Sequence, residues 1–196
     1  MQKLTLFQTI PMTKLIVLLL FPSLVAFGQT TANQESGKNS QQEIIEWKTL
    51  DQSKFSIQYP STWELNQSGQ MGTSFIIFSP LENDEDKFKE NVNLLMQDLT
   101  GQNIDLDKYV EISEGQIKTM LTNSTLIESK RVKKESEEFH KIIYSGDQGI
   151  FHLKFEQYYR VIDDKALVLT FTCETDQFFK FVNTGEKILN SFTQKK

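Results

Sequence analysis

Apolar and polar side chains alternate along much of the chain after residue 44, which is typical of β-strands that bury one face. Residues 46–51 and 54–60 form the first such pair and are separated by a short polar turn. In the second segment Phe55, Ile57 and Tyr59 share one face, and the residues between them are polar. The pattern predicts a β-hairpin at the start of the folded region.

A strand with two apolar faces is expected next. In residues 73–80, Phe75 and Ile77 alternate with Ile76 and Phe78. A strand of this kind lies inside a sheet and is covered on both sides.

Residues 81–90 are rich in acids, and we interpret them as a solvated loop rather than a cation site. They lead into another strand at residues 91–99, which aligns Val92, Leu94 and Met96 on one face.

The hydrophobic period changes to that of an α-helix over residues 105–121. Asp105 is a natural N-cap, because its carboxylate can accept a hydrogen bond from a free backbone N–H group of the first turn. The residues expected on the buried side are Leu106, Tyr109, Val110, Ile117, Met120 and Leu121, with Ser113 between them.

Four consecutive antiparallel strands are expected next, at residues 124–132, 138–146, 150–162 and 166–174. Asp163 and Asp164 mark a tight hairpin turn between the last two. In the final strand one face consists of Leu167, Leu169, Phe171 and Cys173.

A closing helix is predicted from apolar residues at helical spacing, namely Phe178, Phe181, Val182, Ile188, Leu189 and Phe192. Gly185 lies in the same stripe, so the helix can approach the sheet closely at that point. The order strands, helix, strands, helix predicts an α+β fold in which α-helices cover a mostly antiparallel β-sheet.

The N-terminus has the features of a secretory signal peptide. Residues 1–14 carry two lysines and no acid, and an apolar run follows from Leu15 to Phe27. This run is shorter than the roughly 20 residues that a membrane-spanning helix needs. The expected organisation is a signal peptide at 1–28, a disordered polar linker at 29–43 and a single domain at 44–196. The mature protein is expected to be exported, periplasmic or extracellular, with no stable membrane insertion; an uncleaved signal anchor is the alternative.

The composition makes the exported chain mildly acidic. The full sequence has 21 basic and 26 acidic residues, so removal of a leader with two lysines changes the net charge from −5 to −7. Nucleic acid is not expected as a partner, because phosphate binding needs a clustered basic surface. The one basic cluster, Lys130, Arg131, Lys133 and Lys134, is interpreted as a solvated strand edge where lysines hinder further pairing.

Residues that could carry chemistry are few. Cys173 is the only cysteine, so no intrachain disulfide can form, and we interpret it as a small buried hydrophobic residue. His140 and His152 lie on different segments and are interpreted as strand-surface residues. The sequence has no glycine-rich phosphate loop, paired-histidine metal motif, glycine-flanked serine nucleophile or Cys-x-x-Cys pair. No catalytic, cofactor-binding or metal-binding residue is assigned.

One segment partly matches the residue spacing of a calcium-binding loop. Asn103, Asp105, Asp107 and Glu114 stand at positions one, three, five and twelve of such a loop, but Lys108 replaces the glycine at the sharp turn. Acids at the start of a helix account for the same pattern through the helix dipole.

The stretch FSIQYPSTWEL, residues 55–65, resembles the opening signature of the PsbP and DcrB-like superfamily, with Tyr59, Pro60 and Trp63 as the matching residues. The resemblance implies a PsbP-like αβα sandwich. Pro60 has no N–H group for the strand ladder and so ends the strand. Trp63 is expected to fold back as a plug of the core; a ligand platform is the alternative for its indole.

Two functions from different classes follow. The first is an exported non-catalytic module of the cell envelope that binds an unknown protein partner or assembly, as the resemblance implies for some relatives. The second is a small-ligand or metal-ion carrier with its site between the sheet and the first helix. An enzyme ranks third, because no catalytic constellation is present.

Overall fold

The computed structural model describes residues 46–134 and 137–195. The predicted signal peptide and the predicted linker lie outside the described residues. In chain order the elements are β1 (Trp47–Asp51), β2 (Phe55–Pro60), β3 (Glu64–Asn66), the short 3-10 turn η2 (Gln70–Gly72), β4 (Thr73–Phe78), β5 (Asn91–Asp98), α1 (Leu106–Met120), β6 (Thr122–Lys133), β7 (Glu138–Gln148), β8 (Phe151–Ile162), β9 (Lys165–Glu174), α2 (Phe178–Asn190) and β10 (Thr193–Gln194).

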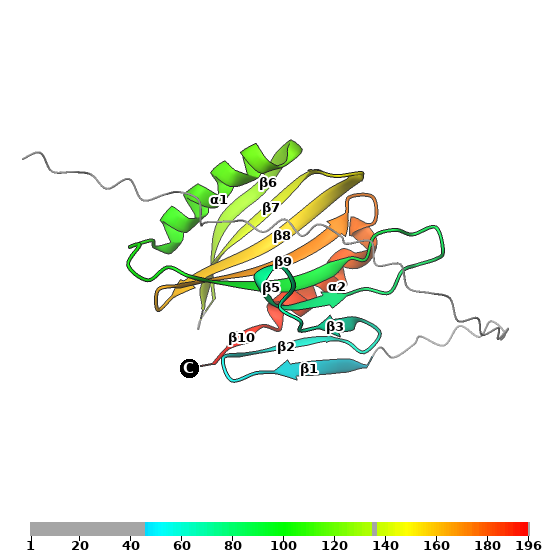
Figure 1. The fold of residues 1–196 in the computed structure, drawn as a ribbon, viewed down its shortest axis with the longest axis horizontal. Coiled ribbons are helices and arrows are strands. Elements are labelled where there is room, and N and C mark those ends of the chain that lie inside the picture. Colours follow the sequence, from blue (N-terminus) through cyan, green and yellow to red (C-terminus); the bar gives the residue numbers. More distant parts are fainter. Residues whose placement is uncertain (1–45, 135–136, 196) are drawn as a thin grey trace, which may run out of the picture.

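The strands form two antiparallel sheets (Figure 1). The large sheet has the order β3-β4-β5-β9-β8-β7-β6. The predicted hairpin of β1 and β2 is confirmed, with Trp47 opposite Pro60. This hairpin does not join the large sheet; it pairs with β10 in a separate small sheet, which the sequence pattern did not indicate.

The two helices cover opposite faces of the large sheet (Figure 1). Helix α1 packs on β6 and β8, and α2 packs on β9, β5 and the hairpin strand β2. The predicted α+β class, a mostly antiparallel sheet covered by helices, is confirmed.

Each face of the sheet has its own hydrophobic core, and β9 belongs to both. Leu169 and Phe171 lie in the core on the α2 side, whereas Ala166 and Val168 lie in the core on the α1 side. The predicted shared face of Leu167, Leu169, Phe171 and Cys173 is confirmed. Strand β4 is likewise buried on both faces, as predicted, although it lies next to the short edge strand β3.

The local signals for turns and caps are also confirmed. The Asp105 side chain accepts a hydrogen bond of 2.8 Å from the backbone N–H of Lys108 and so caps α1. Asp163 and Asp164 have φ values of 50° and 55°, the left-handed pair that a two-residue hairpin between twisted strands requires.

Gly185 is where α2 comes closest to the sheet. A Cβ atom at this position would lie 2.7 Å from the ring of Phe171, a distance that no real Cβ tolerates. The absent side chain therefore sets the spacing between helix and sheet, as the sequence predicts.

For one residue of α1, the predicted burial is wrong. Met120 is 50 % exposed, because it is the last residue of the helix and the next residue, Leu121, takes the buried position. Within the described part of the chain, neither helix is long and apolar enough to cross a bilayer.

Three residues of the basic cluster lie on β6, the outermost strand of the large sheet, and Lys134 follows directly, so the interpretation as a strand edge is confirmed. The side chains of Lys130, Lys133 and Lys134 are exposed. Arg131 is more covered and pairs with Asp107 of α1 and, at 3.5 Å, with Glu138 of β7.

Candidate functional site

The three residues of the opening signature come together at the end of β2. Pro60 accepts a backbone hydrogen bond of 2.9 Å from the N–H of Trp63, which closes the turn after the strand. Tyr59 and Trp63 are buried in the core on the α2 side, and the indole meets the ring of Phe181 at 6.3 Å between centroids. The predicted burial of Trp63 is confirmed, and an indole in this position is closed to a ligand.

The thiol of Cys173 is fully buried, as expected for a hydrophobic core residue. Its Sγ atom lies 3.7 Å from Oε1 of Glu90. Burial, and then the neighbouring carboxylate, raise the pKa of the thiol far above its ordinary value. The sulfur therefore stays protonated at neutral pH and is not a nucleophile.

His140 is the one histidine with a serine beside it, and the geometry does not activate that serine. The Ser129 hydroxyl lies 2.6 Å from Oε1 of Glu114 and 2.8 Å from Nε2 of His140. An ionised carboxylate only accepts, so the hydroxyl donates to Glu114 and takes its second bond from an Nε2–H group. A general base would need the opposite polarity, with the imidazole accepting the serine proton.

His152 lies far from His140. In the β7–β8 register His140 pairs with Tyr159 and His152 pairs with Asp147, which separates the histidines by seven positions, or about 23 Å along the strands. His152 is exposed and its Nδ1 atom lies 2.6 Å from Oδ1 of Asp147. The two histidines share no site.

The acids of the incomplete calcium loop have other partners. Asp105 caps α1, Asp107 pairs with Arg131, and Glu114 accepts from Ser129. In residues 46–134 and 137–195, no group of three or more His, Cys, Asp or Glu side chains is placed to hold a metal ion.

The space between the sheet and α1, where a carrier would hold its ligand, is nearly filled. The cavity there measures about 10 Å³, enough for about one water molecule. Its polar lining is largely self-satisfied, since Gln157 donates to Thr170 at 2.9 Å and accepts from the hydroxyl of Tyr159. An organic ligand does not fit in this cavity.

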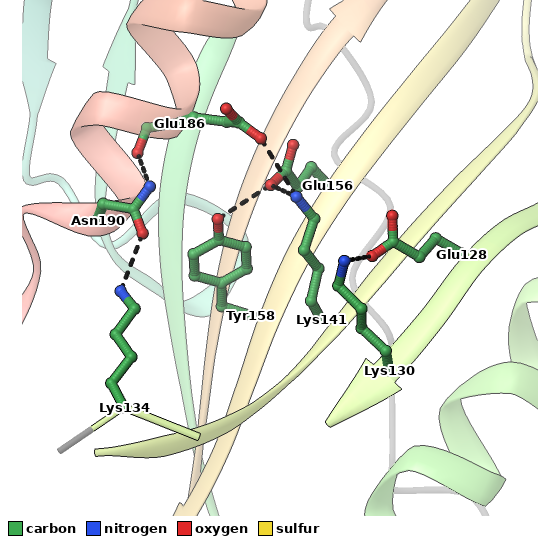
Figure 2. Close-up of polar contacts among 8 residues, drawn as sticks. All are labelled: Glu128, Lys130, Lys134, Lys141, Glu156, Tyr158, Glu186 and Asn190. Atoms are coloured by element: carbon green, nitrogen blue, oxygen red, sulfur yellow. Dashed lines mark hydrogen bonds and ion pairs between the residues drawn. The ribbon is translucent and has the colours of Figure 1, made fainter. Parts of the chain in front are cut away.

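A buried charged group lies on the other face, under α2. This Lys141 cluster consists of Lys141 of β7, Glu156 and Tyr158 of β8, and Glu186 of α2 (Figure 2). The Lys141 ammonium lies 2.6 Å from Glu156 and 3.2 Å from Glu186, and the Tyr158 hydroxyl donates to Glu156 at 3.0 Å. Glu156 is 0 % exposed, and its second oxygen has no partner.

The electrostatics of the cluster favour a structural role. Burial raises the pKa of Glu156, and the lysine opposes that shift. Burial alone would lower the pKa of Lys141, but its bonds to Glu156 and Glu186 outweigh burial and raise it. The ammonium thus bridges the sheet to α2. Sequence reasoning missed this cluster, because alternating polar residues on a strand are typical of a solvated face.

A second polar feature is open to solvent. It is a hollow of about 380 Å³ between the segment before β5, the β7–β8 turn and the junction of β9 with α2. We call it the acidic hollow, because its lining includes one lysine, Lys87, and the acids Glu82, Glu85, Asp86, Glu90 and Glu174. Figure 1 shows these three segments at the same end of the molecule.

The interpretation of residues 81–90 as a solvated loop is wrong for two of its residues. Phe88 is buried and its ring lies 5.1 Å from that of Phe151 between centroids. Glu90 is also buried and accepts a 3.2 Å hydrogen bond from Ser79. The apolar anchor at Phe88 holds the acidic segment against the sheet, which gives the hollow a fixed wall.

One exposed apolar side chain lines the acidic hollow, and a second is exposed on the helix turn that begins next to it. Ile150, at the tip of the β7–β8 turn, lines it and is 88 % exposed. Phe179 is 91 % exposed and belongs to the first turn of α2, which begins directly after Gln177 of the hollow lining. Acids and exposed apolar groups therefore meet at one end of the protein, which is the candidate functional site.

No protein-family model matches the sequence, and a comparison with curated proteins yields no significant match. Solved structures do match. The solution structure of cyanobacterial PsbP (CyanoP) from Synechocystis sp. PCC 6803 superposes with a TM-score of 0.56 at 13 % identity, over 81 % of this chain and 98 % of that one.

The protein has a PsbP-like fold. This confirms the resemblance drawn from the sequence at the level of the fold. LpqN of Mycobacterium tuberculosis, described as involved in cell envelope biogenesis, superposes with a TM-score of 0.60 at 16 % identity, over 79 % of this chain and 93 % of LpqN. PA94 of Pseudomonas aeruginosa, described as a putative regulator, gives a TM-score of 0.55 at 10 % identity, over 76 % of this chain and 98 % of that one.

Proposed function

We propose that this protein is an exported, non-catalytic PsbP-like module that binds a protein partner in the cell envelope. The observation that carries the proposal is the near-complete exposure of Ile150 and Phe179 at one end of the molecule. Large apolar groups that are rimmed by polar residues are characteristic of protein interaction sites.

Two further observations support the export and the location. The residue pattern of 1–28 is that of a cleavable leader. LpqN, which shares the PsbP-like fold, is described as involved in cell envelope biogenesis.

A binding role also suits the chemistry of the chain. Ser129 is not activated by His140, and the Cys173 thiol is held protonated by burial and a neighbouring carboxylate. A small-ligand or metal carrier is the alternative function, and the cavity of about 10 Å³ under α1 counts against an organic ligand at that place.

The test is capture of the partner from the compartment itself. The full-length gene carrying a C-terminal tag is expressed in the native host, the cells are treated with a cleavable crosslinker, and the exported fraction is purified. We expect a protein that begins at Gln29 by mass spectrometry, together with one partner at stoichiometric level. A protein that stays uncrosslinked and alone under these conditions would contradict the proposal.

Native mass spectrometry of the same preparation separates the two functions. An interaction module is expected to show the bare chain mass after the partner is removed. A carrier would retain an adduct of low mass through desalting.

A further inference from the structure

We propose that the acidic hollow is the docking site for a basic and apolar segment of the protein partner, in which Lys or Arg side chains enter the hollow and neighbouring apolar side chains pack on Ile150 and Phe179. This inference rests on the proposed function and assigns it a surface and a partner chemistry.

The charge of the lining selects a cationic occupant. Five of its residues are acids, against the single base Lys87. Lys87 donates to the backbone carbonyl of Asp84 at 2.7 Å, so its ammonium is turned to the backbone of its own loop. Within the described residues, Glu82 is the one acid of the five that forms an ion pair, with Lys180. A lysine or arginine of a partner placed in the hollow would therefore meet a surplus of negative charge, whereas an acidic segment would be repelled.

Two carboxyl groups of the hollow have a raised pKa, mainly because they are buried. Burial and then the charges of Asp176 and Asp86 raise the pKa of Glu174, and burial is the main cause of the raised pKa of Glu90. A cation beside Glu174 and Glu90 would lower the pKa of both groups, because an opposite charge favours the ionised form of a carboxyl group.

The shape and rim favour a protein segment over a small molecule. Small-molecule sites are mostly apolar and enclose most of their ligand. The acidic hollow is open to solvent, and most of its lining residues are charged or polar. Phe179 is an aromatic side chain of the kind enriched at protein interfaces, and Ile150 adds exposed apolar area.

The hollow is also a preformed surface. The segment of residues 81–90, which forms one side of the hollow, is held by the packing of Phe88 on Phe151. The ion pair of Glu82 with Lys180 joins the same segment to α2. A rigid wall lowers the entropy cost of binding, because little chain has to be ordered on association.

A first experiment uses defined peptide probes. The mature protein is titrated into fluorescent peptides of about 12 residues that combine Lys with Leu, Glu with Leu, or Lys with Ser, and anisotropy is followed at low and high salt. We expect the Lys and Leu peptide to bind at least about tenfold tighter than the other two, with affinity falling as salt rises. Equal binding of the Lys and Ser peptide would overturn the proposal, since it would show attraction of any cation.

Variants locate the binding. Charge reversal in Glu82→Lys/Glu85→Lys is expected to weaken the Lys and Leu peptide about tenfold, and Phe179→Ser several-fold. The matched controls are Glu111→Lys and Met120→Ser, an exposed acid and an exposed apolar residue on α1. Thermal midpoints are measured for every variant so that loss of folding is recognised. Equal losses in the controls and the hollow variants would defeat the assignment.

A second experiment separates failure of the surface from failure of the function. A photocrosslinking amino acid is placed in cells at position 150 or at position 120, and crosslinked partner peptides are sequenced. We expect position 150 to capture one partner through a segment rich in Lys or Arg and apolar residues. A partner captured only from position 120 would overturn the acidic hollow and leave the proposed function standing. If neither position captures a partner although the cleavable crosslinker does, the acidic hollow is overturned and the proposed function stands; if all three fail, the proposed function itself fails.

Discussion

Trp63 closes one end of the core just past the proline that terminates β2, and its indole packs against Phe181 of α2. The other tryptophan, Trp47, is only partly buried and lies under the ammonium of Lys187 at 4.0 Å from the ring centroid.

We expect Trp63→Ala to lower the free energy of unfolding by about 3 to 5 kcal/mol, because it leaves a large cavity in a packed core. Trp47→Ala is expected to cost clearly less. Urea denaturation followed by circular dichroism gives both values. Equal losses for the two variants, or a red-shifted emission that disappears in Trp63→Ala, would show that the Trp63 indole is not in the core.

The buried Glu90 carboxyl group is expected to make the stability of the fold depend on pH. Burial raises its pKa above the value in the unfolded chain, so the folded state holds its proton to higher pH. Stability from this group is therefore fully present below the unfolded pKa of 4.5 and is lost as pH rises through the folded pKa.

The variant Glu90→Gln is expected to gain stability relative to the wild type between about pH 4 and pH 8, by about 1.4 kcal/mol for each unit by which the pKa is raised. Chemical denaturation at both pH values measures the difference, with Glu85→Gln as the control for loss of a charge in the same loop. A difference between Glu90→Gln and the wild type that does not change with pH would show that burial does not disfavour the ionised form of Glu90.

The contact of α2 with the sheet depends on a missing side chain. Gly185→Ala is expected to destabilise the protein by about 1 to 3 kcal/mol, since its Cβ would overlap the Phe171 ring and force repacking. Gly115→Ala in α1 is the matched control, because nothing lies within 4 Å of its Cβ position. The control should gain up to about 1 kcal/mol from helix propensity. Parallel urea titrations that give the same sign for both variants would contradict the close approach of α2.

The Lys141 cluster ties α2 to β7 and β8 through charge. Lys141→Met is expected to cost about 3 to 5 kcal/mol, because it leaves the Glu156 carboxylate buried without a counter-charge. The double variant Lys141→Met/Glu156→Leu should recover most of that loss, since it removes the uncompensated charge as well. A double variant no more stable than Lys141→Met would mean that packing, not charge, governs this contact. Thermal and urea unfolding of all three variants decide between the two.

Most of the elements were accessible from the sequence, for local reasons, whereas the short strands β3 and β10 were not predicted. The alternation in β6 to β9, the cap at Asp105 and the turn at Asp163 and Asp164 are each determined by neighbours a few positions away. Long-range pairing was not accessible. Nothing in the alternation of β2 indicates that its second neighbour is β10 rather than a strand of the large sheet.

At the scale of the whole molecule, the acidic hollow shows the same limit. It joins three segments that are distant in sequence, and acids in a loop are typical of a solvated surface. The apolar residue within the acids, Phe88, is the one local signal that this loop packs against the fold. The exposure of Phe179 was not predictable, because it stands next to Phe178, and only packing decides which of two adjacent aromatic residues is buried.

The layered arrangement predicts how stability is distributed. The strands β5, β9 and β8 lie in the middle of the large sheet, and cores cover both of their faces. Their amides should exchange with solvent most slowly, near the rate set by global unfolding, while β3, β6 and β10 should exchange faster through local opening. Hydrogen exchange with mass spectrometry gives this order directly. Slow exchange in β6 would indicate that another chain covers this edge.

The pairing of β10 with β2 has a consequence for how the protein is made. The Ser191 hydroxyl binds the backbone of Gln58 across 133 residues of sequence, and Thr193 and Gln194 supply the third strand of the small sheet. The amino-terminal hairpin therefore leaves the ribosome long before the strand that completes its sheet. A nascent chain in that state cannot complete the small sheet, so this part of the fold forms only after the last strand has been synthesised.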